Sequence, residues 1–362
     1  MVSAFIVGAN YPWVSCGHDF GPRPPPWAGA RPTDWDAVRR DFDELRVLGL
    51  SVVRYWILAG GVNYPVGRDP SELGERVPFR EPYPSHWRWA DAHSLRFEPR
   101  VEPPPLPSAF LEDFARLLEA CRAAGVKLIP SLLSFEIFLP ILDHQGGPAS
   151  GGRGALVLGR HQGAFLDAVL EPLLDVSESY RDALFAFEVM NEPDWPALAA
   201  PHRGPFAPPA ALCDFLVDAA TRIARRDLLA TIGFCNARPT WLTGAAREAL
   251  ATLAARGRYL HQRHHYARED LGMRLAPARE SAIEPCLLGE LPTAQYSRWA
   301  DPELWATESE PDRYLEARIA LAKERGYAGA LVWACRSSDL HSRWDGRVKA
   351  QVKRAAERVT GA

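Results

Sequence analysis

The sequence of 362 residues lacks the patterns that mark several large classes of protein. None of its six cysteines forms a Cys-x-x-Cys pair, which argues against a zinc or redox motif. No apolar run approaches the roughly 20 residues of a membrane span, and no basic segment with an apolar run opens the chain. We therefore expect a cytoplasmic protein with no membrane partner.

Charge and glycine patterns exclude two further classes. The net charge is −3 and there is no long basic run, which argues against a nucleic-acid partner. No Gly-x-Gly-x-x-Gly follows the first apolar run, which argues against dinucleotide binding. We expect no cofactor. Nothing in the sequence specifies an oligomeric state.

What the chain does contain is apolar residues and tryptophan. Hydrophobic residues make up 47% of the sequence, which is ample for a large core. Twelve tryptophans are a high count. They fit a tryptophan-rich core, and they also fit a cleft in which indoles stack on a flat apolar ligand face such as a sugar ring. Composition does not separate these two interpretations.

Apolar runs alternate with helical patterns along the whole chain. We expect eight strands, at residues 4–10, 51–58, 126–133, 184–193, 229–234, 259–266, 285–289 and 328–334. Helices are expected at residues 33–48, 108–124, 161–176, 208–225, 243–255, 276–281, 311–325 and 347–359. This alternation predicts right-handed βαβ units. The count of eight favours a closed (β/α)8 TIM barrel, an α/β fold, over an open doubly wound sheet.

The prediction treats residues 1–362 as one barrel domain with a long inserted loop at about 59–107. So long a connection in a compact domain is usually functional or disordered, and its aromatic residues favour order. We expect the loop to fold over the barrel mouth and to bring Trp87 or Trp89 near the cleft.

Two of the predicted strands end in a glutamate that is followed by proline. The fourth ends in Asn191-Glu192-Pro193, and the seventh is followed directly by Glu290-Leu291-Pro292. Since active sites of such barrels lie at the carboxyl ends of the strands, Glu192 and Glu290 should face each other there. Paired carboxylates are what acid/base work on an acetal needs, and a separation of about 5–5.5 Å would indicate a retaining glycosidase.

Other strands supply polar and aromatic candidates. Arg54 in the second strand needs a carboxylate partner, which Glu188 or Glu290 could provide, and we favour Glu188 as a structural ion-pair member. Trp333 in the eighth strand fits either core packing or a platform under a sugar. The remaining candidates stand at the ends of the first and sixth strands: Asn10, Trp13, His264 and Tyr266.

Together these strand ends resemble clan A glycoside hydrolases, the retaining (β/α)8 enzymes. Asn191-Glu192-Pro193 with Glu290, Arg54, His264-x-Tyr266 and Trp333 is most similar to glycoside hydrolase family 5, including mannanase-like and cellulase-like members. Residues 187–193 also resemble family 39. One departure is that residues 131–136 lack the histidine that often ends the third strand in family 5.

The resemblance implies a role for each residue. Glu192 would be the general acid/base and Glu290 the nucleophile, while Asn191 would bind the sugar 2-hydroxyl. Arg54 would keep the nucleophile ionised and Tyr266 would hydrogen-bond it. His264 would hydrogen-bond the acid/base or the sugar. Trp333 would stack under the sugar ring.

Our leading interpretation is a retaining β-glycosidase that acts on β-mannosides, β-glucosides or β-galactosides without a metal. The alternative is a catalytically inactive carbohydrate-binding barrel, against which the presence of both glutamates argues. A barrel isomerase or metal-dependent hydrolase ranks last, because only the sixth strand ends in histidine.

Overall fold

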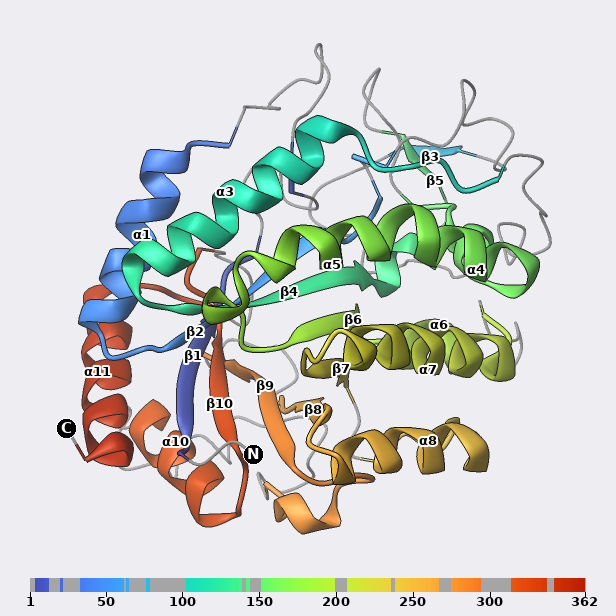
Figure 1. Ribbon diagram of the computed structural model, residues 1–362. Coiled ribbons are helices and arrows are strands. Elements are labelled where there is room, and N and C mark those ends of the chain that lie inside the picture. Colours follow the sequence, from blue (N-terminus) through green and yellow to red (C-terminus); the bar gives the residue numbers. More distant parts are fainter. Residues whose placement is uncertain are drawn as a thin grey trace.

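The computed structural model contains a closed barrel of parallel strands inside a ring of helices (Figure 1). It describes residues 4–12, 20–21, 33–61, 63–64, 76–78, 102–138, 141–143, 151–198, 207–235, 238–266, 275–293, 314–336 and 342–361. The order of neighbouring strands around the barrel is β1-β10-β9-β8-β7-β6-β4-β2. The predicted (β/α)8 TIM barrel is confirmed.

All eight predicted strands are present, each within three residues of its expected start. Their bounds are β1 (Ile6–Asn10), β2 (Val52–Leu58), β4 (Lys127–Ser134), β6 (Phe187–Asn191), β7 (Ala230–Phe234), β8 (Tyr259–His264), β9 (Cys286–Pro292) and β10 (Gly329–Trp333). Apart from the barrel, β3 (Arg76–Pro78) pairs in parallel with β5 (Ile141–Asp143).

Most helices follow the predicted segments, but the helix expected at residues 276–281 is only a 3₁₀ turn, and the short helix Asp194–Ala197 was not predicted. The α-helices are α1 (Trp35–Val47), α3 (Ser108–Ala124), α4 (Gln162–Phe165), α5 (Glu171–Glu178), α6 (Asp194–Ala197), α7 (Pro209–Arg225), α8 (Gly244–Ala255), α10 (Tyr314–Glu324) and α11 (Gly346–Thr360). A π-helical turn, Leu166–Leu170, joins α4 to α5. Short 3₁₀ turns span Phe135–Phe138, Gly154–Val157, Gly159–His161, Arg181–Ala183 and Ala278–Glu280.

Local sequence signals explain where these helices start and stop. The Asp34 carboxylate accepts the Ala37 N–H at 2.9 Å and so caps α1. Helix α3 ends at Gly125, whose φ of 72° lies in the left-handed region that favours glycine. Each helix buries an apolar face, such as Val38, Phe42 and Leu45 of α1.

The inside of the barrel is layered because side chains alternate along a strand. Six buried apolar residues near the strand starts form a cluster: Val52, Ile129, Ala186, Leu260, Leu287 and Leu331. Two positions further along three of these strands stand Arg54, Glu188 and Gln262, all fully buried. A polar layer therefore lies above an apolar one, towards the carboxyl ends of the strands.

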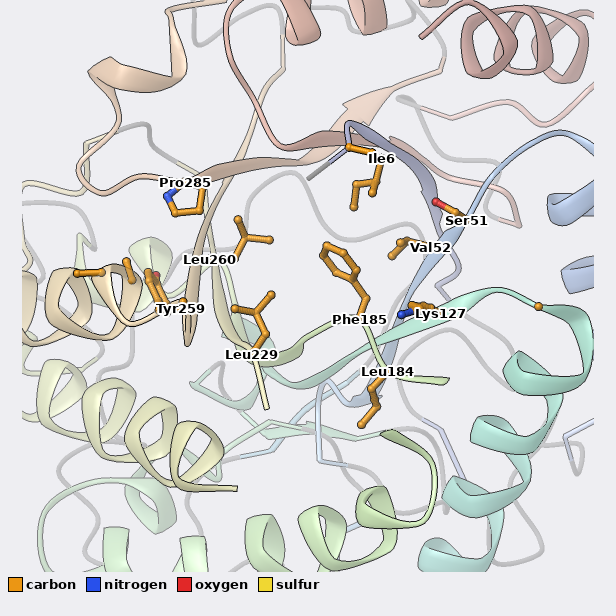
Figure 2. A pocket seen from close by; sticks show the side chains of 15 residues that line it. Ile6, Ser51, Val52, Lys127, Leu184, Phe185, Leu229, Tyr259, Leu260 and Pro285 are labelled. Carbon is orange, nitrogen blue, oxygen red and sulfur yellow. The ribbon is translucent and has the colours of Figure 1, made fainter. Parts of the chain in front are cut away.

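The amino end of the barrel carries an apolar pocket of about 860 Å³ (Figure 2). Its lining residues stand at the beginnings of the strands or just before them, and include Ile6, Val52, Leu184, Phe185, Leu229 and Leu260. This pocket is at the opposite end from Glu192 and Glu290. Active sites of such barrels lie at the carboxyl end, so we assign it no part in the chemistry.

Much of the predicted inserted loop lies outside the described residues. Its described parts are residues 59–61, 63–64, 76–78 and 102–107. Trp87 and Trp89 lie outside them, so the expected closure over the mouth stays a prediction, and so does the cytoplasmic location. Within the described residues, no helix combines the length and apolar character needed to cross a membrane.

Candidate active site

Glu192 and Glu290 face each other at the carboxyl end of the barrel. Glu290 belongs to β9, and Glu192 follows directly after β6. An oxygen of Glu192 and an oxygen of Glu290 lie within 4.8 Å of each other. The side chain of Glu192 is 14% exposed, whereas that of Glu290 is 4% exposed. The two carboxylates are therefore closely spaced, in contrast to the roughly 9 Å of a widely spaced pair.

Both oxygens of Glu290 are held by hydrogen-bond donors. Oε1 accepts from Arg54 at 2.7 Å, and Oε2 accepts the Tyr266 hydroxyl at 2.5 Å. Burial raises the pKa of Glu290 above its ordinary value, and the nearby charge of Glu192 adds to this. His264, Arg54 and Tyr266 act in the opposite sense, because each stabilises the ionised carboxylate. Glu290 is thus a desolvated carboxylate with dedicated charge stabilisation.

Glu192 is placed by an unusual backbone conformation and two side-chain contacts. Its φ is 48°, in the left-handed region that residues other than glycine seldom adopt. Its N–H donates to the Gly233 carbonyl at 2.6 Å. Its Oε1 lies 2.8 Å from His264 Nδ1, and its Oε2 accepts the indole N–H of Trp195 at 2.9 Å. Such backbone outliers gather at functional sites.

His264 stands between the two glutamates. Its Nδ1 is 2.8 Å from Glu192 and 3.4 Å from Glu290. Complete burial lowers the pKa of His264 to about 4, and the Arg54 charge also lowers it. The imidazole is therefore neutral at neutral pH, and it can hydrogen-bond either glutamate without adding a charge.

Arg54 connects the site to the polar layer beneath it. It donates to both oxygens of Glu188, at 2.5 and 2.6 Å, in addition to its bond to Glu290. The same Glu188 oxygens accept from Ser131 and Gln262, both at 2.8 Å. The guanidinium also lies 4.2 Å from the centroid of the Trp56 ring. Both glutamates considered as partners of Arg54 thus bind it. The oxygens of Glu188 make all these hydrogen bonds inside the protein.

The two asparagines occupy different positions. Asn191 accepts from Arg54 at 2.6 Å, donates to Ser134 Oγ at 3.1 Å, and is 5% exposed. Asn10 is fully buried, accepts from Arg54, and donates to the carbonyls of Gly289 and Val332. The amide of Asn10 makes its hydrogen bonds within the protein. We therefore interpret Asn10 as a support for Arg54 and not as a contact to the sugar.

The aromatic candidates fall into two groups. Trp333 is 8% exposed and makes an edge contact with Trp56, with ring centroids 5.4 Å apart. Tyr266 packs against the same buried cluster. This leaves Trp333 little exposed surface, although it lies at the end of its strand beside the site. Trp13 lies outside the described residues.

Glu192, His264 and Glu290 also have the donor atoms of a three-ligand metal site, all within 4.8 Å of one another. The surroundings oppose this use. Arg54 places a cation 2.7 Å from one Glu290 oxygen, and Tyr266 occupies the other. A second cation here would meet direct repulsion, so we favour metal-free chemistry.

Sequence reasoning missed several residues of the site. Ser131 and Gln262 support Glu188, and Trp56 supports Arg54. Gln262 has the same strand parity as His264, so alternation along the strand could have identified it. Trp195 follows Glu192 by three residues, but nothing local in the sequence predicts its contact with the carboxylate.

Comparison with known proteins finds the fold among solved glycosidases. No protein-family model and no curated protein matches the chain. A β-1,4-D-mannanase from Cryptopygus antarcticus is 17% identical, with a TM-score of 0.63 over 98% of this chain and 90% of that one. A β-mannanase from the blue mussel Mytilus edulis is 16% identical, with a TM-score of 0.62 over 98% and 92%.

A third similar structure is a GH5_18 variant from Streptomyces cattleya, solved in complex with Manβ1-4GlcNAc. It is 16% identical, with a TM-score of 0.54 over 98% of this chain and 81% of that one. At these identities the likeness concerns the fold. The resemblance to family 5 glycoside hydrolases, seen first in the strand ends, thus extends to the architecture of the whole barrel.

Proposed function

We propose that this protein is a retaining β-glycosidase, with Glu290 as nucleophile and Glu192 as general acid/base. One observation carries the proposal. The two carboxylates lie within 4.8 Å at the barrel mouth, and only Glu290 is bound by Arg54 and Tyr266. Carboxylates this close do not both ionise readily, because their charges repel. Arg54 and Tyr266 oppose the rise that burial causes in the pKa of Glu290, so we assign the role of proton donor to Glu192.

The chemistry then takes two steps. Ionised Glu290 attacks the anomeric carbon and forms a glycosyl ester, while Glu192 gives its proton to the departing glycosidic oxygen. In the second step Glu192 removes a proton from water, the water oxygen attacks the anomeric carbon, and the ester bond to Glu290 breaks. The sugar leaves with its original configuration, and Glu192 is protonated again.

The surrounding residues support both steps. Arg54 and Tyr266 hold Glu290 in place as it changes from carboxylate to ester and back. Asn191, beside Glu192, is the residue we propose for the sugar 2-hydroxyl, and Trp333 for the wall under the ring. The metal-free pair needs no further group for acid/base work on an acetal.

We propose β-mannosides as the first substrates to test, before β-glucosides and β-galactosides. The support is indirect: similar folds belong to β-mannanases, and a further one was solved with Manβ1-4GlcNAc. The precise sugar, the linkage and the choice between short oligosaccharides and polymers depend on side chains around the barrel mouth.

A panel of 4-nitrophenyl β-glycosides tests the proposal, with release of the phenol as the readout. We expect turnover of at least one sugar by the wild type and none by Glu290→Ala. Saturable sugar binding without turnover by the wild type would instead support the inactive carbohydrate-binding barrel.

A further inference from the structure

Trp195 is the one exposed aromatic side chain that touches the catalytic pair among the described residues. It lies in α6, three residues after Glu192, and it is 44% exposed. Its indole nitrogen donates to Glu192 Oε2 at 2.9 Å. The contact joins a surface ring to the carboxylate that we propose as the acid/base.

The turn that presents Trp195 is firmly anchored. Asp194 is buried and accepts from the Cys235 N–H at 2.8 Å and from the Trp241 indole at 3.1 Å. The Trp195 N–H itself donates to the Glu192 carbonyl at 3.2 Å. Three hydrogen bonds therefore hold the turn from which the indole projects.

An indole nitrogen can donate a hydrogen bond but cannot accept one. When Glu192 is protonated, the oxygen that faces Trp195 is best occupied by a lone pair, and the proton is best placed on the other oxygen. That other oxygen, Oε1, lies 2.8 Å from His264 Nδ1, the atom that also approaches Glu290. The proton is thereby placed on the oxygen beside His264, the residue that stands between the two glutamates.

We propose that Trp195 is a positioning residue that selects Oε1 of Glu192 as the proton donor and stabilises the carboxylate after the proton has left. This inference rests on the proposed glycosidase function. Because the indole hydrogen bond favours ionised Glu192, Trp195 also keeps the acid/base from holding its proton too tightly for the second step.

Trp195→Phe tests this, because phenylalanine keeps a ring and removes the N–H. With aryl glycosides of poor leaving groups, kcat/KM should fall about tenfold, the worth of one hydrogen bond to a charged group. With 2,4-dinitrophenyl glycosides, whose phenol needs little protonation, it should change less than about twofold. The basic limb of the pH profile should move to higher pH, since the pKa of Glu192 rises without the donor.

Phe135→Leu is the matched control, because Phe135 contacts the Trp195 ring at a centroid distance of 6.2 Å but donates nothing to Glu192. It should keep the wild-type leaving-group dependence and pH profile. An equal loss on all leaving groups in Trp195→Phe, or no change in either readout, would overturn the inference while the glycosidase proposal stands. A wild type inactive on every glycoside would remove both.

Discussion

At the carboxyl end of the barrel the inward side chains are polar and hydrogen-bonded to one another, whereas at the amino end they are apolar and line a pocket. Arg54 and Val52 stand two residues apart on the same strand, as do Gln262 and Leu260. One of each pair belongs to the polar layer and the other to the apolar cluster. The same strands therefore carry both environments.

The difference shows how the barrel separates stability from chemistry. The apolar layer gains free energy from burial, about 25 cal/mol for each Å² removed from water. The polar layer gains little net stability, because desolvation of Arg54, Glu188 and Glu290 offsets their attraction. The polar layer lies at one end only, which is understandable if that end carries out the chemistry. Substitutions at the carboxyl end should therefore change activity, whereas those at the amino end should change stability alone.

The largest effect is expected from the catalytic pair. Glu290→Ala should abolish turnover of every substrate, because the nucleophile takes part in both steps. Glu192→Ala should lower turnover of natural sugars by about 10²–10⁴-fold but spare the first step on a glycoside with an acidic phenol. Added azide should then release a β-glycosyl azide, detected by NMR. If the two phenotypes were exchanged, our assignment of nucleophile and acid/base would be reversed.

Arg54→Met should unfold the protein at much lower denaturant concentration, with a loss of about 3–5 kcal/mol. It leaves Glu188, which is fully buried, without its cation. In the double variant Arg54→Met/Glu188→Gln the buried charge of Glu188 is gone, so part of the stability should return while activity stays lost. Urea titrations of the two variants measure this. Equal stability of the single and the double variant would contradict this account, because the unpaired charge of Glu188 would then not be the cause of the lost stability.

Tyr266→Phe should lower kcat/KM by about 10- to 100-fold, because it removes a hydrogen bond to a charged group. That bond lowers the pKa of Glu290. Its loss should raise this pKa, and the acidic limb of the pH–rate profile should then move to higher pH. Stability should hardly change. A limb that stays in place would show that Glu290 does not control it.

The smallest effect on activity is expected at the amino end. Leu229→Ala trims the wall of the apolar pocket, where Leu229 is half-buried, and should lower the free energy of unfolding by about 1 kcal/mol. The kcat of the folded protein should equal that of the wild type. A changed kcat would contradict the separation of the two ends.

Folding itself should weaken in acid, and the cause lies at the carboxyl end. The pKa of His264 is lowered to about 4, and that of His265 to about 2, by burial. A lowered pKa means that the unfolded chain takes up the proton first. Stability is therefore complete above the ordinary histidine value of about 6.5 and falls as pH drops towards 4. Urea titrations at pH 7 and pH 4.5 should show the decline.

Strand positions and the paired glutamates could be predicted because their signals are local. The apolar run before Asn191-Glu192-Pro193 and its counterpart before Glu290 place two carboxylates at strand ends, and barrel closure brings strand ends together. A carboxylate partner could be predicted for Arg54 because a buried guanidinium must be paired. The structure provides two such partners.

The remaining contacts depend on tertiary geometry. The Trp195 hydrogen bond needs the positive φ of Glu192 and the anchoring of Asp194 by residues more than 40 positions away. Asn10 could not be assigned to the interior from its place at a strand end, because strand ends supply both substrate contacts and supports. Its three hydrogen bonds inside the protein favour a supporting role for Asn10.

Covalent trapping of the nucleophile tests the central claim most directly. A 2-deoxy-2-fluoro glycosyl fluoride of the sugar that the panel identifies should inactivate the enzyme, because the 2-fluorine slows both steps while fluoride leaves readily. Proteolysis and mass spectrometry should then place the sugar on Glu290. A label on another residue, or a product of inverted configuration without any label, would contradict the double displacement that we propose for Glu290 and Glu192.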